Sequence, residues 1–282
     1  MGRIINGKEI ALKIKEDIKS FVSEREKNNL KIPKIASVLV GNDGGSIYYM
    51  ESQEKNAKAL GVGFEKVVLS EEISEEALIN KIHELNEDEN IQGIILQLPL
   101  PKKFDEKNIV REISASKDID CLTFESQGRL YMGEPEFLPC TPNSVVTIIK
   151  SLGIDFTGKR VVVLGRSNIV GKPVAQLLLN ENATVTICHS KTQNLKEICK
   201  EADILVVAIG KPKFIDDTYI NENAVVIDVG TSRFEGKITG DVDFDKVIDK
   251  CKAVTPVPGG VGALTTTLLI KNACEALKKN EN

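Results

Sequence analysis

The 282-residue chain contains only two histidines, and none of its apolar runs approaches the length of a membrane span. A spanning helix needs roughly 18 or more consecutive apolar residues, so no such helix is expected. Two isolated imidazoles, His83 and His189, do not suffice for a histidine-based metal centre, and we predict no metal site. The N-terminal stretch MGRIINGKEIALKIKEDIKS also lacks the apolar core and cleavage site of a secretion signal.

Neither sign of charge dominates, because 37 Lys and Arg residues stand against 41 Asp and Glu residues, a formal net charge of −4. This balance gives no electrostatic reason to expect nucleic acid or an anionic membrane surface as a partner. The six cysteines are scattered and form no CxxC pair. Without a secretion signal, we interpret them as reduced thiols and expect a cytoplasmic protein.

What is present is an alternating α/β pattern in a chain long enough for two ordinary domains. The apolar run Ile35 to Gly41 predicts a buried strand, and the segments FEKVVLS and IQGIILQLPLP predict two more. A helix follows the first strand, and a second helix, started by Ser74, precedes the third strand. This order favours a parallel sheet covered by helices.

The pattern restarts at Cys140. A helix closed by Gly153 is followed by four strands, RVVVLG, ATVTICH, DILVVAIG and NAVVIDVG, and a last helix covers about 262–279. We therefore predict two α/β lobes with a cleft between them. The first, 1–141, binds the substrate and is completed by the helix 263–282; the second, 142–262, is a Rossmann-like nucleotide-binding domain.

The segment VVVLGRSNIVGKPVAQLLL has the order strand, tight turn, helix. Gly165 ends the strand, Gly171 stands at the third glycine of a G-x-G-x-x-G pattern, and Ser167 replaces the middle glycine. The N–H groups at the start of the helix are expected to face a phosphate. The alternative is a structural strand-helix-strand unit that binds nothing.

The end of the next strand indicates which nucleotide binds. NAD enzymes place an Asp or Glu there for the ribose diol, whereas this chain has His189, Ser190 and Lys191. Arg166, in the preceding turn, can reach the same place. A cation and hydroxyls without a carboxylate favour a 2′-phosphate, and hence NADP.

The motifs GRSNIVGKP, CHSKT, TPVPGGVG, ILQLPLP and KDID followed by GRL occur in this order along the chain. Together they resemble the methylenetetrahydrofolate dehydrogenase/cyclohydrolase family over essentially the whole length. The resemblance implies two lobes flanking a cleft and a homodimer joined through the nucleotide lobes. It also implies NADP-dependent oxidation of 5,10-methylenetetrahydrofolate to the 5,10-methenyl cation. In most members hydrolysis to 10-formyltetrahydrofolate follows.

The resemblance also assigns residues. Tyr49 corresponds to the tyrosine that stacks on the folate, Gln97 to the glutamine that hydrogen-bonds the catalytic lysine, and Asp120 to the aspartate that holds the pterin. The positions that contact NADP are Gly165, Arg166, Ser167, Ser190 and Thr231. Two positions depart from the usual pattern: Thr231 and Ser232 replace Ile-Asn, and Cys121 replaces a glycine.

A third departure concerns the reaction itself. The family places its catalytic lysine four residues after the tyrosine, and here that position is Gln53. The spacing from Tyr49 to Gly61 matches the family without a gap. Lys55 is two residues further along the helix and therefore points about 200° away from Gln53. It does not replace the missing base.

The two half-reactions differ in their need for a proton carrier. Hydride transfer moves no proton, so positioning of the folate against the nicotinamide suffices. Hydrolysis requires water to lose a proton and a ring nitrogen to gain one, a task for a general acid or base. With Gln53 in place of lysine, we predict a dehydrogenase with a weak or absent cyclohydrolase.

Three other functions remain as alternatives. The first is an ordinary bifunctional enzyme in which another group replaces the lysine. The second is a catalytically silent nucleotide-binding or scaffold protein, which the retention of Tyr49, Gln97 and Asp120 disfavours. The third is a dehydrogenase for an amino or hydroxy acid, for which no His-Asp or Lys-Asp motif is present. Asp120 itself could instead be a buried capping carboxylate.

Overall fold

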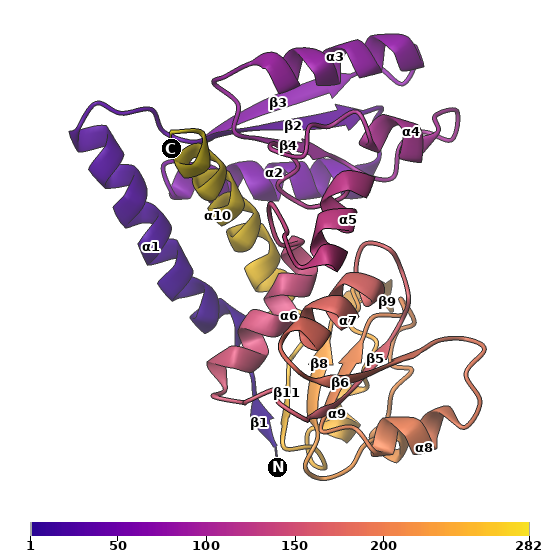
Figure 1. Cartoon of the computed structure of the whole chain (residues 1–282). Helices are drawn as coiled ribbons and strands as arrows, with labels where there is room; N and C mark the ends of the chain where they lie inside the picture. Colours follow the sequence, from indigo (N-terminus) through magenta and orange to yellow (C-terminus); the bar gives the residue numbers. More distant parts are fainter. Residues whose placement is uncertain (1, 282) are drawn as a thin grey trace. The chain divides into compact units, whose positions relative to one another are not determined.

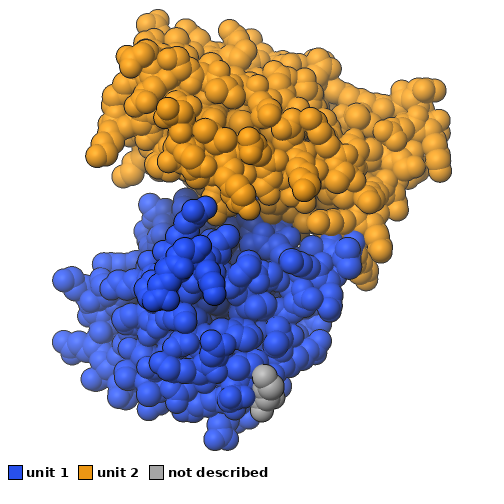
Figure 2. All heavy atoms as spheres, turned by 180° about the vertical axis from the view of Figure 1, so that it is seen from behind, with its two compact units in different colours: residues 1–12, 140–265 blue, residues 13–139, 266–282 orange. Residues whose placement is uncertain are grey.

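The computed structural model describes residues 2–281, which form two compact units. Unit 1 comprises residues 1–12 and 140–265, and unit 2 comprises residues 13–139 and 266–282 (Figure 2). Two helices, α1 (Gly7–Lys27) and α10 (Gly262–Asn280), each contribute residues to both units. Within the described residues, no helix is both long and apolar enough to cross a membrane.

Unit 2 is built on a parallel sheet with the strand order β3-β2-β4. Its strands are β2 (Lys34–Val40), β3 (Gly63–Leu69) and β4 (Gly93–Leu96). Its helices are α2 (Gly44–Ala59), α3 (Glu75–Glu87), α4 (Glu106–Val110) and α5 (Phe124–Met132), with most of α1 and α10. Figure 1 shows α2 and α3 on opposite faces of this sheet.

The continuous apolar run of β2 follows from its central position in this sheet. Every residue from Ile35 to Val40 is buried, as expected for a parallel strand covered on both faces. On one face Leu78 and Ile82 of α3 pack against the strands. The predicted start of α3 is confirmed, because the Ser74 hydroxyl accepts a hydrogen bond from the Ala77 N–H.

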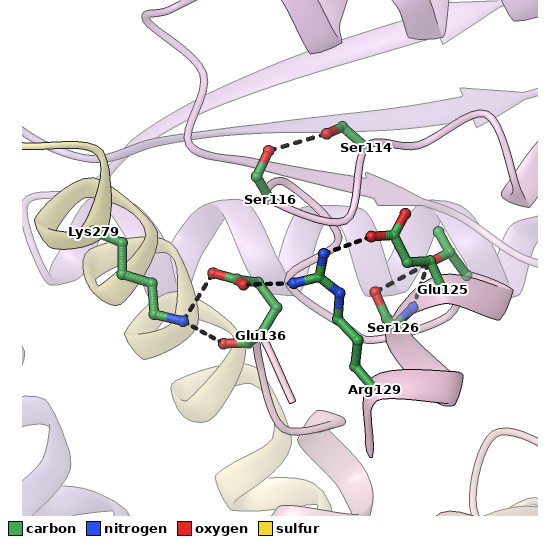
Figure 3. A network of polar contacts seen from close by, with 8 residues as sticks. Ser114, Ser116, Glu125, Ser126, Arg129, Glu136 and Lys279 are labelled. Atoms are coloured by element: carbon green, nitrogen blue, oxygen red, sulfur yellow. Dashed lines mark hydrogen bonds and ion pairs between the residues drawn. The ribbon is translucent and has the colours of Figure 1, made fainter. Parts of the chain in front are cut away.

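The C-terminal part of α10 is tied to unit 2 by a polar network (Figure 3). Lys279 Nζ donates to the Glu136 main-chain oxygen at 2.7 Å and to its Oε1 at 2.8 Å. Arg129 of α5 bridges from Glu136 to Glu125. Exposed ion pairs of this kind contribute little stability each, on the order of 0–1 kcal/mol. The buried apolar face of α10, which includes Leu269 and Ala273, therefore dominates its attachment.

Unit 1 contains a six-stranded parallel sheet in the order β1-β11-β8-β7-β5-β6. These strands are β1 (Arg3–Ile4), β5 (Arg160–Leu164), β6 (Thr184–Cys188), β7 (Ile204–Val207), β8 (Val225–Asp228) and β11 (Ala253–Val254). Its helices are α6 (Cys140–Ser151), α7 (Gly171–Asn180), α8 (Leu195–Lys200), α9 (Phe244–Val247) and the short 3₁₀ helix η1 (Asp217–Tyr219). A separate antiparallel hairpin joins β9 (Ser232–Phe234) to β10 (Lys237–Thr239).

The strand order of unit 1 reverses at β5. The chain moves from β5 to β6 on one side, then crosses to β7 on the other side of β5. In open α/β sheets, ligands bind beyond the carboxyl ends of the strands at such a reversal. A ligand site is therefore expected next to Leu164 and Val207, the last residues of β5 and β7.

The division into units differs from the predicted boundaries 1–141 and 142–262 at the N-terminus. Residues 1–12 belong with unit 1 because β1 extends its sheet: Arg3 pairs with Ala253 and Ile4 with Val254. Two residues of strand carry no usable periodicity, so the sequence does not reveal them. The break at 139/140 lies two residues from the predicted one, and residues 266–282 pack with unit 2.

Candidate active and nucleotide-binding sites

In unit 1 a pocket of about 300 Å³ opens at the carboxyl ends of the central strands. Its lining comes from the last residue of β5 and from residues after β5, β6 and β7: Leu164, Gly165, Arg166, Ser167, His189, Ser190, Leu195, Ala208, Ile209, Lys211 and Phe214. Four of the five predicted cofactor residues lie here, and Thr231, which is exposed and precedes β9, is not among them. The position of this pocket agrees with the strand reversal at β5.

Gly165 is required by a close approach of two backbones. A Cβ added at Gly165 would lie 2.2 Å from the Ala208 carbonyl oxygen, and its φ of +129° disfavours other residues. A Cβ added at Gly171 would lie 2.3 Å from the Gly165 carbonyl oxygen, so α7 packs tightly on the turn. The two glycines therefore set the shape of the turn that lines the pocket.

Ser167 occupies part of the helix N-terminus that was expected to be open. Its hydroxyl accepts hydrogen bonds from the N–H groups of Val170 at 3.2 Å and Gly171 at 3.3 Å. Its carbonyl oxygen accepts from the Lys172 N–H at 3.1 Å. The expectation that the first N–H groups of α7 are open to a phosphate is therefore wrong for these three residues, because Ser167 satisfies them.

The end of β6 places hydroxyl and amide groups, and no carboxylate, at the pocket. His189 Nδ1 accepts from the Lys191 N–H at 3.1 Å, and the His189 N–H donates to the Thr192 hydroxyl at 2.8 Å. These bonds hold the tight turn that carries Ser190. Ser190 and Arg166 are both exposed side chains on the same pocket. The site can thus present a cation and a hydroxyl to an anionic ligand.

The sequence reasoning missed the contribution of β7. Ile209, Lys211 and Phe214 follow this strand and line the pocket, with Lys211 Nζ located 5.5 Å from the centroid of the Phe214 ring. Applying the carboxyl-end rule to the segment AIGKPKF would have identified them.

In unit 2, the predicted substrate residues Tyr49 and Gln53 lie on α2, and Gln97 directly follows β4. Gln97 is 6% exposed, and its Nε2 donates to the Ser37 hydroxyl at 2.9 Å and to Gln53 Oε1 at 2.7 Å. Gln53 is partly buried, whereas Lys55 is exposed. The structure therefore brings Gln53 and Gln97 together and keeps Lys55 out of this contact, as the helical geometry predicts.

Tyr49 and Tyr48 stand at the exposed start of α2. They are 54% and 63% exposed, with ring centroids 6.1 Å apart in an edge-on arrangement. The helix is started by Asp43, whose carboxylate accepts from the Ser46 N–H at 2.8 Å and from its hydroxyl at 2.9 Å. These bonds hold the pKa of Asp43 below its usual value. An exposed ring on a capped helix is available to stack on a planar ligand.

The KDID segment contains two carboxylates with different environments. Asp118 is buried, and its oxygens accept from the N–H groups of Leu122 at 2.9 Å and Thr123 at 2.8 Å. Asp120 is only partly buried. Asp118 therefore has a buried capping role of the kind that the sequence left open for Asp120.

Cys121, where the family has glycine, adopts φ = +57° and is fully buried. This left-handed conformation explains why glycine is usual at the position. Burial raises the pKa of the Cys121 thiol, so it is not a reactive nucleophile. Cys140, at the start of α6, is likewise buried.

Comparisons with known proteins identify the family of both parts of the chain. Residues 5–120 match the model of the tetrahydrofolate dehydrogenase/cyclohydrolase catalytic domain, and residues 139–281 match that of its NAD(P)-binding domain. The bifunctional protein FolD of Clostridium beijerinckii is 77% identical over 281 residues, covering 100% of both chains.

Solved structures give the same result. The bifunctional enzyme FolD of Campylobacter jejuni aligns with a TM-score of 0.96 at 38% identity, covering 99% of this chain and 100% of that one. The Trypanosoma brucei methylenetetrahydrofolate dehydrogenase-cyclohydrolase, complexed with NADP and an inhibitor, aligns with a TM-score of 0.94 at 35% identity, covering 100% and 99%. The chain belongs to the tetrahydrofolate dehydrogenase/cyclohydrolase family.

Proposed function

We propose that the chain oxidises 5,10-methylenetetrahydrofolate to the 5,10-methenyl cation with NADP as the hydride acceptor. The observation that carries this proposal is the unit 1 pocket, which combines Arg166 and Ser190 at the strand reversal with no carboxylate among its lining residues. The family membership and the NADP-bound relative from Trypanosoma brucei support the same cofactor.

The lining residues fit NADP. Gly165, without a Cβ, lets the end of β5 lie against the Ala208 backbone, and this approach shapes the turn that lines the pocket at Arg166. Arg166 is the candidate partner of the 2′-phosphate, with Ser190 as a second donor. When bound, NADP supplies a ring carbon that accepts hydride, and the chain holds that carbon in position.

On the folate side, Tyr49, Asp120 and Gln97 have separate proposed roles. The exposed ring of Tyr49 stacks on the folate. Asp120, which is only partly buried, binds the pterin through its carboxylate, as the family resemblance implies. Gln97 orients the side chain at position 53.

We further propose that the cyclohydrolase step is weak or absent. The supporting observation is the contact between Gln97 Nε2 and Gln53 Oε1 at 2.7 Å, in which two amides meet where the family has a lysine. Neither amide gains or loses a proton at neutral pH, so neither can act as the general base of hydrolysis. The relatives named as bifunctional favour the alternative, an enzyme that also makes 10-formyltetrahydrofolate.

Two assays on the purified chain separate these proposals. The first supplies methylenetetrahydrofolate with NADP or NAD and follows reduction of the nucleotide; a clear preference for NADP is expected. The second supplies methenyltetrahydrofolate alone and follows its disappearance. Loss at the rate of the enzyme-free control supports the missing cyclohydrolase, whereas rapid loss establishes the bifunctional enzyme. If neither NADP nor NAD is reduced, the proposed dehydrogenase activity is refuted.

We also propose a homodimer formed through unit 1. Strand β6 is an edge strand, and unprotected edges invite pairing with another chain. Ile187 on this strand is 40% exposed and Leu179 of α7 is 55% exposed. Light scattering coupled to gel filtration should give twice the chain mass, and Ile187→Lys should shift it toward the monomer. A monomeric wild-type chain would refute this arrangement.

A cytoplasmic location completes the proposal. All six cysteines are buried and none forms a disulfide, which is consistent with a reducing compartment. Tetrahydrofolate is itself readily oxidised, so the substrate suits the same compartment. Fractionation of cells that express the tagged chain would test this location, and recovery outside the cytoplasmic fraction would contradict it.

A further inference from the structure

The loop 209–215, which follows β7, supplies three of the residues that line the nucleotide pocket. Ile209 and Phe214 give it apolar walls and Lys211 gives it a cation. Gly210 lies between them at φ = +65°, and nothing is within 4 Å of a Cβ added there. The shape of this part of the pocket therefore depends on what holds the loop from behind.

A single short segment, Gly240 and Asp241, holds the loop at both ends. At the first end, Asp241 Oδ2 accepts hydrogen bonds from the Ile209 N–H at 2.7 Å and the Gly210 N–H at 2.9 Å. At the other end, the N–H of Lys213 donates to the Gly240 oxygen at 3.0 Å, and that of Ile215 donates to the Asp241 oxygen at 3.0 Å. The loop is thus fastened on either side of Lys211.

Asp241 is itself fixed by a second buried carboxylate. Asp228, at the end of β8, accepts from the N–H of Asp241 at 3.0 Å and the N–H of Val242 at 2.9 Å. The packing leaves no room for side chains: a Cβ on Gly240 would lie 1.9 Å from Asp228 Oδ2, and one on Gly230 would lie 2.2 Å from Asp241 Cγ. Gly230 in DVGTSR thus serves this packing.

Such an arrangement is costly, because Asp241 is fully buried and its Oδ1 has no hydrogen-bond partner among the described residues. Burying a carboxylate is unfavourable unless strong hydrogen bonds compensate, and bonds to a charged acceptor are about twice as strong as neutral ones. A neutral hydrogen-bond acceptor would be sufficient to hold a loop that had only a structural role. The Asp241 carboxyl group is placed against the two amides whose position sets the pocket wall.

We propose that Asp241 is a positioning residue for the cofactor: its carboxylate holds the loop 209–215 in the conformation that binds the nucleotide. Asp241 does not line the pocket and acts only through the loop. The inference rests on the proposed function in so far as the ligand is NADP. It predicts that changes at Asp241 alter nucleotide affinity and leave folate affinity unchanged.

The test compares Asp241→Ala with Asp241→Asn in the full chain. Alanine removes the acceptor for both amides, whereas asparagine retains one oxygen that can accept from them. We expect Asp241→Ala to raise the Kd and KM for NADP about tenfold, a change of about 1.4 kcal/mol. The KM for methylenetetrahydrofolate should not change. Asp241→Asn should restore NADP binding to within about threefold of the wild type, since its oxygen bonds the same amides.

Asp203→Ala is the matched control. Asp203 Oδ2 accepts from the Arg160 N–H at 2.9 Å at the opposite, amino end of the same sheet. Its loss should lower the melting temperature and leave the Kd for NADP unchanged. Equal rises in Kd for the Asp203 and Asp241 variants would show a general loss of stability and overturn the proposal. An unchanged Kd in Asp241→Ala would also overturn it.

Gly210→Ala provides an independent test if Asp241→Ala does not fold. The new methyl group meets no neighbour, but its backbone conformation is strained, so only the loop is affected. A raised Kd for NADP is expected, and an unchanged Kd would refute the claim that loop conformation controls affinity. Titration of the wild type with NADP distinguishes failure of this inference from failure of the proposed function. If the wild type binds no NADP, the proposed function is refuted.

Discussion

Gln53→Lys restores the residue that the family uses at this position of α2. In the present chain Gln97 Nε2 donates to both Gln53 Oε1 and the Ser37 hydroxyl. An ammonium at position 53 would face these N–H groups, so the Gln97 amide must rotate and present its oxygen. Ser37 permits this rotation, because its hydroxyl can donate as well as accept. The rotated amide would then accept from the lysine and from Ser37.

The expected gain follows from the chemistry of hydrolysis. A positioned general acid or base contributes roughly 10²–10⁴-fold. We expect about 10²-fold, the lower end of that range, because the neighbours of position 53 are adapted to an amide. Partial burial of the site disfavours the charged form of a lysine, so a larger fraction is the neutral amine that can act as a base, while the remainder stays an ammonium. Dehydrogenase turnover should fall modestly, because a cation now lies near a cationic product.

The assay is the enzyme-dependent disappearance of methenyltetrahydrofolate in stopped-flow absorbance. Gln53→Arg is the matched control, because arginine brings the same charge and cannot lose its proton. Lys55→Gln is the second control, and replacing this exposed residue should leave the rate of methenyltetrahydrofolate hydrolysis unchanged. Rapid hydrolysis by the wild type, or an equal gain in the arginine variant, would refute the assignment of proton transfer to position 53.

Four further outcomes are expected. Arg166→Ala should weaken NADP binding by about 1.5–3 kcal/mol, as for a charged hydrogen bond, and barely change NAD binding; equal losses in titrations with both would contradict the 2′-phosphate assignment. Asp120→Asn should raise the Kd for folate and not that for NADP, and the reverse result would refute its placement on the substrate side. Cys121→Gly should have a higher melting temperature than Cys121→Ala, because φ at this position is +57°. Elsewhere glycine usually costs roughly 0.5–1 kcal/mol relative to alanine, so a lower melting temperature for the glycine variant would contradict the strain. Burial raises the pKa of Asp228 from 3.8 to about 7, so its contribution to stability is full below pH 3.8 and is lost as the pH rises through 7. Asp228→Asn should therefore show a flatter melting temperature between pH 5 and 8 than the wild type, and parallel curves would count against the shift.

The elements with strong local signals could be predicted from the sequence. The apolar run at 35–40 could only be a buried strand in a parallel sheet, and Ser74 marked a helix start through its capping hydroxyl. The opposite directions of Gln53 and Lys55 followed from helical rotation alone. Each inference needed only residues within one or two turns of the chain.

What the sequence did not reveal depends on contacts between distant segments. The bonds from Asp241 to Ile209 and Gly210 span some thirty residues and have no periodic signature. Spacing within KDID likewise could not show that Asp118 accepts hydrogen bonds from the N–H groups of Leu122 and Thr123. Such choices are made by burial and by available N–H donors, which appear only in the folded chain.

The most direct test of the account is a single reaction with the purified chain, methylenetetrahydrofolate and NADP, in which NADPH and the methenyl cation are recorded together. The account predicts that both rise in a 1:1 ratio and that the methenyl species then decays only at the enzyme-free rate. NADPH formation without accumulation of the methenyl species would contradict the role given to Gln53. The absence of NADPH would contradict the dehydrogenase itself.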